Sequence, residues 1–470
     1  MPDSTSAASF GSTAVVVCVL VASVISACSP ERSVPEPVEA PASFSQQGSA
    51  DQIDRWWTAF GDDSLNAAID TALSANFTLR AAWARLQEAR AIVDQEQAGL
   101  FPQIDASASA VTERRSEDGA GRNPSERDLE LGAAASYEID LWGRIRARAN
   151  AEQARAEATL SDYRAASLSI AAEVTRAWMQ LAEARRQLDL TEQQVQTNQQ
   201  VLSLLRERFG TGQIRSVDIL RQRQLIAASE QDRSAARARV GVLEHQLAVL
   251  LGTSPPRQPV AGPDSLPDLP PAPETGVPAE LIRRRPDVRA ARFRVAAADR
   301  DLAAAMSDRY PRLTLTASAA TSAQAAENLF DDWVARVAGD LLAPIFYGGA
   351  LQAEVDRAEA RKRELVYAYG QTVLQAFRDV EDALVLETSQ RKQVEKLIQQ
   401  EELAQQAYEQ LRVQYLNGSG SYLDVLTALR DVQRLQRDLL AARRILAEDR
   451  IALYRALAGA FTTERERDDT

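Results

Sequence analysis

Residues 144–209 read RIRARANAEQARAEATLSDYRAASLSIAAEVTRAWMQLAEARRQLDLTEQQVQTNQQVLSLLRERF, and this stretch decides the fold. It contains neither Gly nor Pro and is rich in Ala, Arg, Glu and Gln, which favour helix. Apolar residues recur in it at every seventh position, namely Val174, Leu181, Leu188, Val195, Leu202 and Phe209. That spacing keeps one seam of a helix against a partner helix and predicts a coiled coil. A single helix over the stretch is roughly 100 Å long.

A second stretch of the same kind occupies residues 350–416, where Gly370 is the only Gly and there is no Pro. Two helices of this length far exceed what a globular domain needs. The 470 residues therefore predict one elongated unit built around two long helices, over 144–209 and 350–416, and not a string of ordinary domains.

The composition excludes several classes of function. The formal net charge is -12 and no basic stripe stands out, so we expect no nucleic-acid partner. One His, at position 245, and three Met leave little for a transition-metal site, and we expect no metal and no cofactor. We find no nucleophile motif, metal-ligand spacing or phosphate-binding loop, so we expect no enzymatic activity.

The first residues have the features of an export signal. Residues 14–27 form an apolar run that is too short to span a membrane but has the length of a signal-peptide core. The run ends in Ile25-Ser26-Ala27-Cys28, which resembles the lipobox of bacterial lipoproteins, whose Cys is lipidated. We predict a signal peptide over 1–27 and a lipidated N-terminal tether over 28–62. An ordinary signal peptide followed by a chance Cys is the alternative.

Two regions change from helical to alternating periodicity. Over 103–141 and over 312–343, apolar and polar residues alternate on both sides of a polar loop, and the loops lie at 114–127 and 324–332. Each region is predicted to be a β-hairpin with one apolar and one largely polar face. Strands of at least about nine residues are long enough to cross an outer-membrane bilayer.

The second half of the chain repeats the plan of the first at an offset of about 206 residues. Leu141-Trp142-Gly143 corresponds to Phe346-Tyr347-Gly348, and Leu250-Leu251-Gly252 corresponds to Leu457-Ala458-Gly459. We therefore predict two structural repeats, over 63–253 and 278–460, with a Pro-rich linker over 254–277 and a polar tail over 461–470. Each repeat contains a first helix, a hairpin, a long helix and a return helix. The first helices are expected over 63–99 and 278–307 and the return helices over 217–251 and 422–457.

Four strands per chain are too few to close a barrel in a membrane. The smallest bacterial membrane barrels have eight strands, and an open strand edge in lipid leaves backbone groups unpaired. Several chains must therefore pool their strands.

The chain resembles the TolC-like outer-membrane efflux factors, in the lipoprotein branch that works with RND pumps (the NodT group). The residues that carry the resemblance are the lipobox, Trp56-Trp57 with Phe60, Asp62 and Leu65, Arg284-Arg285-Pro286-Asp287, Tyr310-Pro311 and the turns after the two long helices.

The resemblance implies a mainly α fold with a membrane β part. It implies a homotrimer with a shared twelve-stranded outer-membrane β-barrel and an α-barrel of long coiled-coil helices that extends into the periplasm. Such a protein is lipid-anchored in the cell outer membrane. It serves as the exit duct of a tripartite RND-type efflux pump and passes small molecules from a periplasmic adaptor and an inner-membrane pump to the exterior.

The two turns at the far ends of the long helices are the candidate site. By family position, Asp218 and Asp424 match carboxylates near the closed gate, and Tyr415 matches a Tyr in the gate's hydrogen-bond network. Arg215 is a candidate local partner of Asp218. Gly210, Gly212, Gly418 and Gly420 are expected to form the two turns, because Gly permits the positive φ of a tight reversal. The resemblance implies that these turns dock the adaptor. Alternatively, both Asp residues simply cap the return helices. Thr427 stands where some family members carry a second carboxylate.

Two other functions are open at the level of the sequence. One is an exit duct for type I protein secretion, because members of the family serve both tasks. The other, from a different class, is a lipid-anchored periplasmic coiled-coil scaffold or adaptor, which would also contain long helical hairpins. The alternating strands argue against the scaffold, since a scaffold needs no apolar outer face. The lipobox and the Arg-Pro-Asp segment favour small-molecule efflux, and the sequence does not indicate the substrate.

Overall fold

The computed structural model describes residues 36–45, 55–114, 125–255, 262–263, 266–267, 269–276 and 278–469. The predicted signal peptide, Cys28 and most of the predicted tether and linker lie outside the described residues. The chain divides into two units, Met1–Glu36 and Pro37–Thr470, and the fold described below is that of the second unit.

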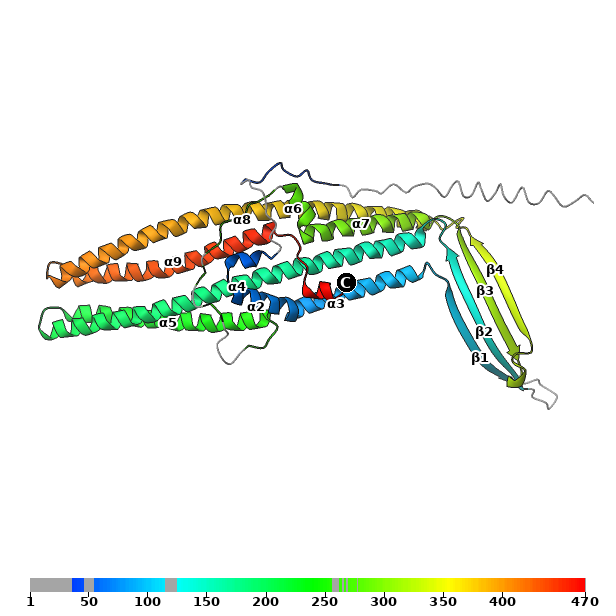
Figure 1. The fold of residues 1–470 in the computed structure, drawn as a ribbon, viewed down its shortest axis with the longest axis horizontal. Helices are drawn as coiled ribbons and strands as arrows, with labels where there is room; N and C mark the ends of the chain where they lie inside the picture. The colour runs from blue at the N-terminus through cyan, green and yellow to red at the C-terminus, as the bar shows by residue number, and fades with distance from the viewer. Residues whose placement is uncertain are drawn as a thin grey trace, which may run out of the picture. The chain divides into compact units, whose positions relative to one another are not determined.

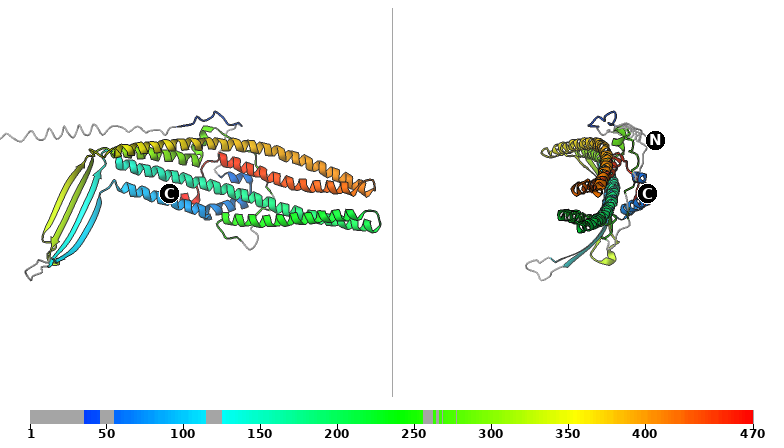
Figure 2. Two further views of the ribbon diagram at one scale, coloured as in Figure 1. Left: turned by 180° about the vertical axis from the view of Figure 1, so that it is seen from behind. Right: turned by 90° about the vertical axis from the view of Figure 1, so that its left-hand side faces the viewer.

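Two long helices organise this unit (Figure 1). They are α4 (Arg144–Gly210) and α8 (Ala350–Leu416), and they confirm the two long helices predicted over 144–209 and 350–416. The other helical elements are η1 (Trp56–Phe60), α2 (Asp63–Ala75), α3 (Phe77–Ala98), α5 (Ser216–Leu250), α6 (Pro278–Arg284), α7 (Pro286–Ser307), η2 (Ala326–Asn328), α9 (Tyr422–Leu457) and α10 (Glu464–Asp468). Seen along the long helices, α3, α4, α5, α7, α8 and α9 form one curved layer (Figure 2).

The layer is four helices wide along its length. In the half next to the sheet, α4 packs against α3 and α7, and α7 packs against α8. In the other half, α4 packs against α5 and α9, and α9 packs against α8. The shorter helices thus occupy the same two positions in turn: α3 is followed by α5 on one side of α4, and α7 is followed by α9 on the other.

The two first helices are broken, and the prediction of continuous helices over 63–99 and 278–307 was wrong. The first helix stops at Asn76, which leaves the helical conformation at ψ 126° and whose side chain caps α3 by accepting from the amides of Thr78 and Leu79. The second stops at Arg285, because the following Pro286 disfavours a helical conformation at the residue before it. Pro286 then begins α7.

Both breaks hold neighbouring elements in place. The Asn76 amide donates to the carbonyl of Leu250 at the end of α5, at 2.9 Å. The Arg285 guanidinium binds the carboxylates of Asp287 and Asp379, at 2.7 and 3.1 Å, and so fastens the start of α7 to α8. The Arg-Pro-Asp segment is therefore a structural clamp between two helices.

The main hydrophobic core surrounds the paired tryptophans. Trp56 and Trp57 are almost fully buried; Trp56 stacks on Tyr454 of α9 and Trp57 meets the edge of Phe461. Asp62 caps α2 and also accepts a hydrogen bond from the indole of Trp178 in α4, at 2.8 Å. The segment from Trp56 to Asp62 thus packs against both α4 and α9.

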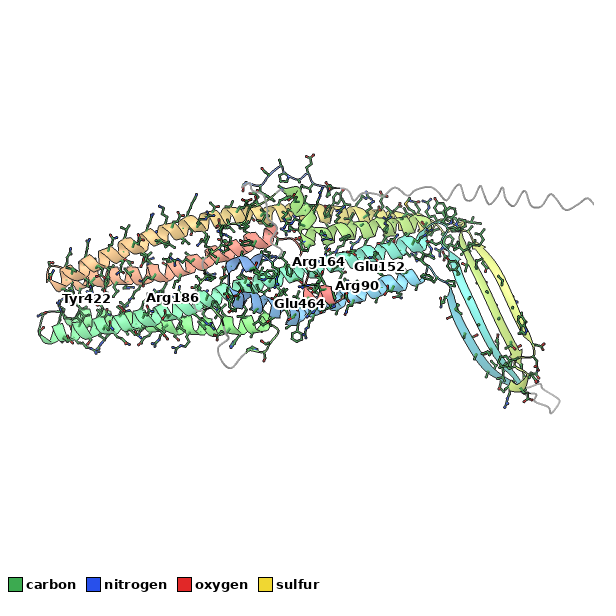
Figure 3. The ribbon with its side chains drawn as sticks, viewed as in Figure 1. Arg90, Glu152, Arg164, Arg186, Tyr422 and Glu464 are labelled. Carbon is green, nitrogen blue, oxygen red and sulfur yellow. The ribbon has the colours of Figure 1, made fainter. Side chains whose placement is uncertain are left out.

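The residues predicted to be a polar tail contain a packed segment. Phe461 is buried, and the short helix α10 begins with a capping box on Thr463. Glu466 accepts two hydrogen bonds from Arg164 of α4, at 2.8 and 2.9 Å. Figure 3 shows Arg164 and the start of α10 side by side at mid-length of the helical layer.

Four antiparallel strands form one sheet in chain order. They are β1 (Gln103–Arg114), β2 (Ser125–Ile139), β3 (Arg312–Ala323) and β4 (Trp333–Leu342). The loop predicted at 114–127 lies mostly outside the described residues. Among the described strands, β1 and β4 are each paired on one side only.

The register sorts the residues of the sheet onto two faces. One row across the strands runs Ala106, Ala133, Ala319 and Ala335. The row of Glu138, Thr314 and Asp340 is five residues away along β2, an odd number, and therefore belongs to the other face. Directly paired residues point to the same side of a sheet. One face is therefore apolar across all four strands and the other is largely polar, as predicted.

No helix in the described part of the chain is both long and apolar enough to cross a membrane.

Candidate functional site

The two turns expected to form the site lie together at the end of the helices farthest from the sheet (Figure 1). Gly212 and Gly418 have φ of 72° and 76°, so both turns use glycine for a left-handed backbone. Gly210 is the last residue of α4, and neither it nor Gly420 has a positive φ. Gly420 is instead needed for space, because a Cβ there would lie 3.1 Å from the backbone nitrogen of Tyr415.

Asp218 is a buried carboxylate between two arginines. It stands in the first turn of α5, its side chain is 7% exposed, and Arg215 and Arg221 lie 3.8 and 3.5 Å from its oxygens. The expected partnership with Arg215 is therefore present in the structure. No cap hydrogen bond from the Asp218 side chain is found among the described residues, and its position in the first turn favours a negative charge.

Asp424 has a different environment from Asp218. It stands in the first turn of α9, is exposed, and is two residues beyond Tyr422. The cap of α9 is Ser421, whose hydroxyl accepts from the amide of Leu423 at 3.1 Å. Thr427 donates its hydroxyl to the carbonyl of Leu423, at 2.9 Å, and adds no charge. Asp424 is thus free to face solvent or another chain.

Two tyrosines pack at the tip. The hydroxyl of Tyr415 is buried without a hydrogen-bond partner among the described residues, its ring lies 5.6 Å from that of Tyr422, and Arg208 covers it at 5.1 Å. The hydroxyl of Tyr422 donates to Gln222 of α5, at 2.5 Å. Burial raises the pKa of Tyr422, with Tyr415 and Asp218 adding to the shift. Figure 3 labels Tyr422 between the two helix pairs.

Sequence reasoning missed Tyr422 and Gln222, and also Asn198, whose backbone carbonyl accepts from Gln222 at 2.6 Å. A signal for Asn198 was present. It lies three residues after Val195, on the second seam of the seven-residue repeat, where an apolar residue is expected. A polar residue at such a position marks a specific contact between helices.

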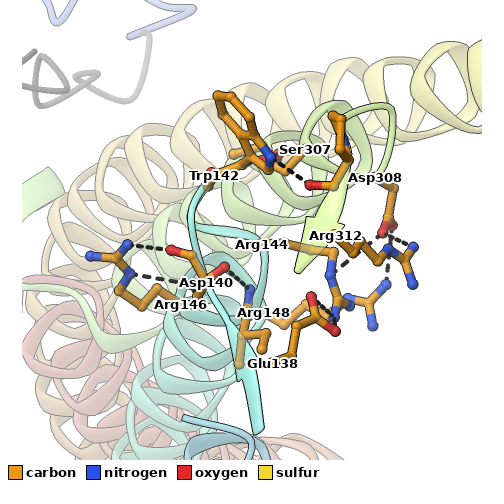
Figure 4. Close-up of polar contacts among 12 residues, drawn as sticks. Glu138, Asp140, Trp142, Arg144, Arg146, Arg148, Ser307, Asp308 and Arg312 are labelled. Carbon is orange, nitrogen blue, oxygen red and sulfur yellow. Dashed lines mark hydrogen bonds and ion pairs between the residues drawn. The ribbon is translucent and has the colours of Figure 1, made fainter. Parts of the chain in front are cut away.

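At the opposite end, charged and aromatic residues join the sheet to the rods (Figure 4). Arg144 binds Glu138 at 2.8 Å, and Asp308 accepts from Arg148 and Arg312 at 3.1 and 2.6 Å. Trp142 donates from its indole to the carbonyl of Pro311, at 2.7 Å, and stacks on Tyr310. These contacts connect the end of β2 to the start of β3, so the hairpins of the two repeats are held together where the sheet joins the helices.

Comparison with known proteins agrees with this architecture. A family model described as outer membrane efflux protein matches residues 68–253 and 277–459. Outer membrane protein OprJ of Pseudomonas aeruginosa is 31% identical, over 95% of this chain and 96% of its own. The pyoverdine export outer membrane protein OpmQ of Pseudomonas putida is 30% identical, over 91% of this chain and 92% of its own.

Solved structures give the same result. The outer-membrane channel OprN matches with a TM-score of 0.84 and 27% identity, over 92% of this chain and 98% of that one. The cation efflux system protein CusC of Escherichia coli K12 is 28% identical, and a CusC structure matches with a TM-score of 0.80.

The two-faced sheet, the duplicated rods and these similarities define an outer-membrane channel. The chain belongs to the outer membrane efflux protein family. Its members are outer-membrane channels, not enzymes, and membership confirms the predicted efflux function and outer-membrane location. It also excludes the alternative of a periplasmic scaffold.

Proposed function

We propose that this protein is the homotrimeric exit duct of a tripartite RND-type efflux pump. It passes small molecules from a periplasmic adaptor and an inner-membrane pump across the outer membrane. The observation that carries the proposal is the four-stranded sheet, which has one continuous apolar face and two edges that no other described strand pairs with. Three copies supply twelve strands, and pairing β4 of one copy with β1 of the next leaves no edge open to lipid.

The helical layer supports the same assembly. Its two outer edges, formed by α3 with α5 and by α8, carry large apolar side chains that the single chain leaves exposed. Examples are Phe77, Val242 and Val249 on one edge and Tyr367, Val385 and Leu403 on the other. The edges differ, so copies join head to tail, and such contacts close into a ring.

Lipidation of Cys28 is part of the proposal. Residues 37–45 lie along α8: Pro37 packs on Gly370, where a Cβ would approach its ring to 3.1 Å, and Phe44 is buried against Phe377. The chain between Cys28 and Pro37 spans at most about 32 Å. Gly370 is about 30 Å along α8 from Ala350, where the helix leaves the sheet. A lipid on Cys28 can thus just reach the membrane beside the sheet.

The transported molecules belong to the class that pump and adaptor select. Relatives named for pyoverdine export, for solvent efflux and for cation efflux are all 28–30% identical to this chain. Each of those names describes efflux or export, which favours the small-molecule pump over the type I secretion duct.

The assembly is tested by the protein mass of the detergent-solubilised mature protein, measured by light scattering with the detergent subtracted. The expected mass is close to three times the 51.4 kDa of the chain, less the signal peptide. A monomer or dimer that stays in solution without detergent contradicts the proposal.

We further propose that the tip is a gate held closed in part by Asp218 and Asp424, and that its turns dock the adaptor. Changing both residues to Asn is expected to raise the single-channel conductance in planar bilayers at least about twofold and to lower cation selectivity. The control is Asp189→Asn, an exposed carboxylate of α4 away from the tip. Unchanged conductance with unchanged selectivity rejects this role.

A further inference from the structure

A set of buried side-chain amides and one hydroxyl occupies the helix interfaces between the tip and the main core. We call it the amide network, and its members are Gln194 and Asn198 of α4, Gln222 and Ser229 of α5, and Gln433 of α9. All five are less than one-tenth exposed, and Asn198 and Gln222 are fully buried. The efflux function does not by itself explain why polar residues stand at these positions.

Asn198 is the centre of the network because it bonds to both return helices. Its amide nitrogen donates to the Ser229 hydroxyl of α5, at 2.8 Å. Its amide oxygen accepts from Gln433 of α9 at 3.1 Å, and its nitrogen approaches the Gln433 oxygen at 3.3 Å. One side chain on α4 thus holds α5 on one side and α9 on the other.

The network continues in both directions along α4. Toward the tip, Gln222 donates to the backbone carbonyl of Asn198 and accepts the hydroxyl of Tyr422. Away from the tip, Gln194 donates to the backbone carbonyl of Gln433, at 3.1 Å, and accepts from Arg437 at 2.7 Å. A continuous chain of hydrogen bonds therefore runs from Tyr422, beside the turn, to the middle of α9.

This arrangement matters because α5 and α9 make far fewer contacts with each other than either makes with α4. Apolar seams are not directional and tolerate small rotations and slides of one helix against another. Buried amides lose their partners when the helices move, so they define one register and one rotation. Near the tip, the bond from Tyr422 to Gln222 joins α9 to α5 directly, and Asn198 fixes the position of both helices relative to α4.

We propose that Asn198 is a positioning residue for the gate: through the amide network it holds α5 and α9 in the arrangement in which the tip is closed. The inference rests on the proposed gate at the tip. Opening then requires the bond between Tyr422 and Gln222 to break. The tip ends of α5 and α9 move, while the contact between Asn198 and Gln433 stays in place and acts as their pivot.

The test is single-channel conductance of the full mature trimer in planar bilayers, without adaptor. Asn198→Leu keeps the size of the side chain and removes its hydrogen bonds, and it is expected to raise the conductance about threefold. The matched control is Gln199→Leu, the same kind of change at the exposed neighbouring residue. The control is expected to conduct like the wild type.

A second variant keeps the test decisive if Asn198→Leu does not assemble. Tyr422→Phe removes one hydroxyl at the end of the network and leaves the core packing intact. Like Asn198→Leu, it is expected to raise the conductance. The thermal stability of each trimer is measured in parallel. A trimer that melts earlier but conducts like the wild type shows a merely structural network and overturns the inference.

The Asp218→Asn, Asp424→Asn double variant separates the two proposals. If it raises the conductance while Asn198→Leu and Tyr422→Phe do not, the gate stands and the role of Asn198 is overturned. If the wild type already conducts as much as the double variant and both network variants, there is no closed tip and both proposals fall.

Discussion

At the scale of the residue, Gly252 shows how strictly the junction between the shorter helices is packed. It follows the end of α5 with φ 75°, and a Cβ on it would lie 2.5 Å from the carbonyl oxygen of Ala75 at the end of α2. Only glycine combines this conformation with this approach. The corresponding Gly459 of the second repeat lies against Arg284, so the duplicated glycines mark the same junction twice.

Gly252→Ala is expected to lower the stability of the trimer by about 1–3 kcal/mol, because the new side chain strains the backbone and meets the Ala75 carbonyl. The measurement is the temperature of trimer dissociation and unfolding. Gly241→Ala, within α5 where a Cβ meets nothing within 4 Å, is the control. It is expected to stabilise the helix by about 0.5–1 kcal/mol. Equal losses in both variants contradict this account of Gly252.

Asp449 makes the stability depend on pH. Burial raises the pKa of this α9 carboxyl from 3.8 to about 6, and Glu448 and Glu387 add to the shift. The folded protein therefore binds more protons than the unfolded chain between these two values, and this contribution to stability decreases as the pH rises through that window.

Asp449→Asn is accordingly expected to raise the melting temperature at pH 7.5, by the equivalent of about 1 kcal/mol because solvent screens a half-buried group. The advantage should vanish near pH 4, where the wild-type carboxyl is also neutral. Thermal melts across this pH range check it, with Asp438→Asn, an exposed carboxylate of the same helix, as the control. An advantage that grows as the pH falls has the wrong sign for this mechanism.

At the scale of the element, α9 is held by buried charge as well as by amides. Arg450 binds Glu387 of α8, and both side chains are at most 7% exposed; Glu387 also binds Arg391. Burial opposes ionisation of Glu387, but its hydrogen bonds to Arg391 and Arg450 outweigh burial and lower its pKa. Arg450 further donates to the carbonyl of Pro270 in the linker. One arginine thus fastens α9 to α8 and to the linker between the repeats.

Arg450→Met is expected to destabilise the protein by about 3 kcal/mol, because Glu387 stays buried with one partner fewer. The double variant Glu387→Met, Arg450→Met should recover much of the loss, since no uncompensated charge remains. Denaturant titrations of both single variants and the double variant give the coupling between the two residues. Arg434→Met breaks only exposed pairs and should cost less than about 1 kcal/mol. Simple additivity of the two single losses would disprove the pairing.

At the scale of the whole molecule, the sheet decides the assembly. Its apolar face includes Val337, which is 83% exposed in the single chain, and the next residue, Ala338, pairs with Thr316 on the polar face. The proposed trimer turns the first face to lipid and the second to the lumen. Neighbouring residues of β4 therefore have opposite environments.

Val337→Arg is expected to cost about 2–4 kcal/mol near the middle of the bilayer and to reduce the yield of trimer in the outer membrane. Ala338→Arg adds the same charge one residue later, on the lumen side, and should leave the yield close to that of the wild type. Recovery of trimer from purified outer membranes measures both. Equal yields, or the reverse order, would contradict the assignment of the two faces.

The sequence by itself determined the long helices, the strands with their faces, and the duplication, because these follow from local periodicity. Val174, Leu181 and Val195 repeat at helical spacing and are buried, whichever other elements meet them. The glycines of the turns and the Asp218–Arg215 pair were also within reach, since both depend on residues close together in the chain.

Only the tertiary structure decided what depends on distant segments. The breaks at Asn76 and Arg285 have local causes, but the contacts that they make with Leu250 and Asp379 join segments far apart in the sequence. Asn198 could be noticed as polar at an apolar position, but its partners on two other helices could not be named. Periodicity specifies which face of an element is buried. Which side chains meet across that face depends on which helices pack together, and periodicity does not specify the neighbours of a helix.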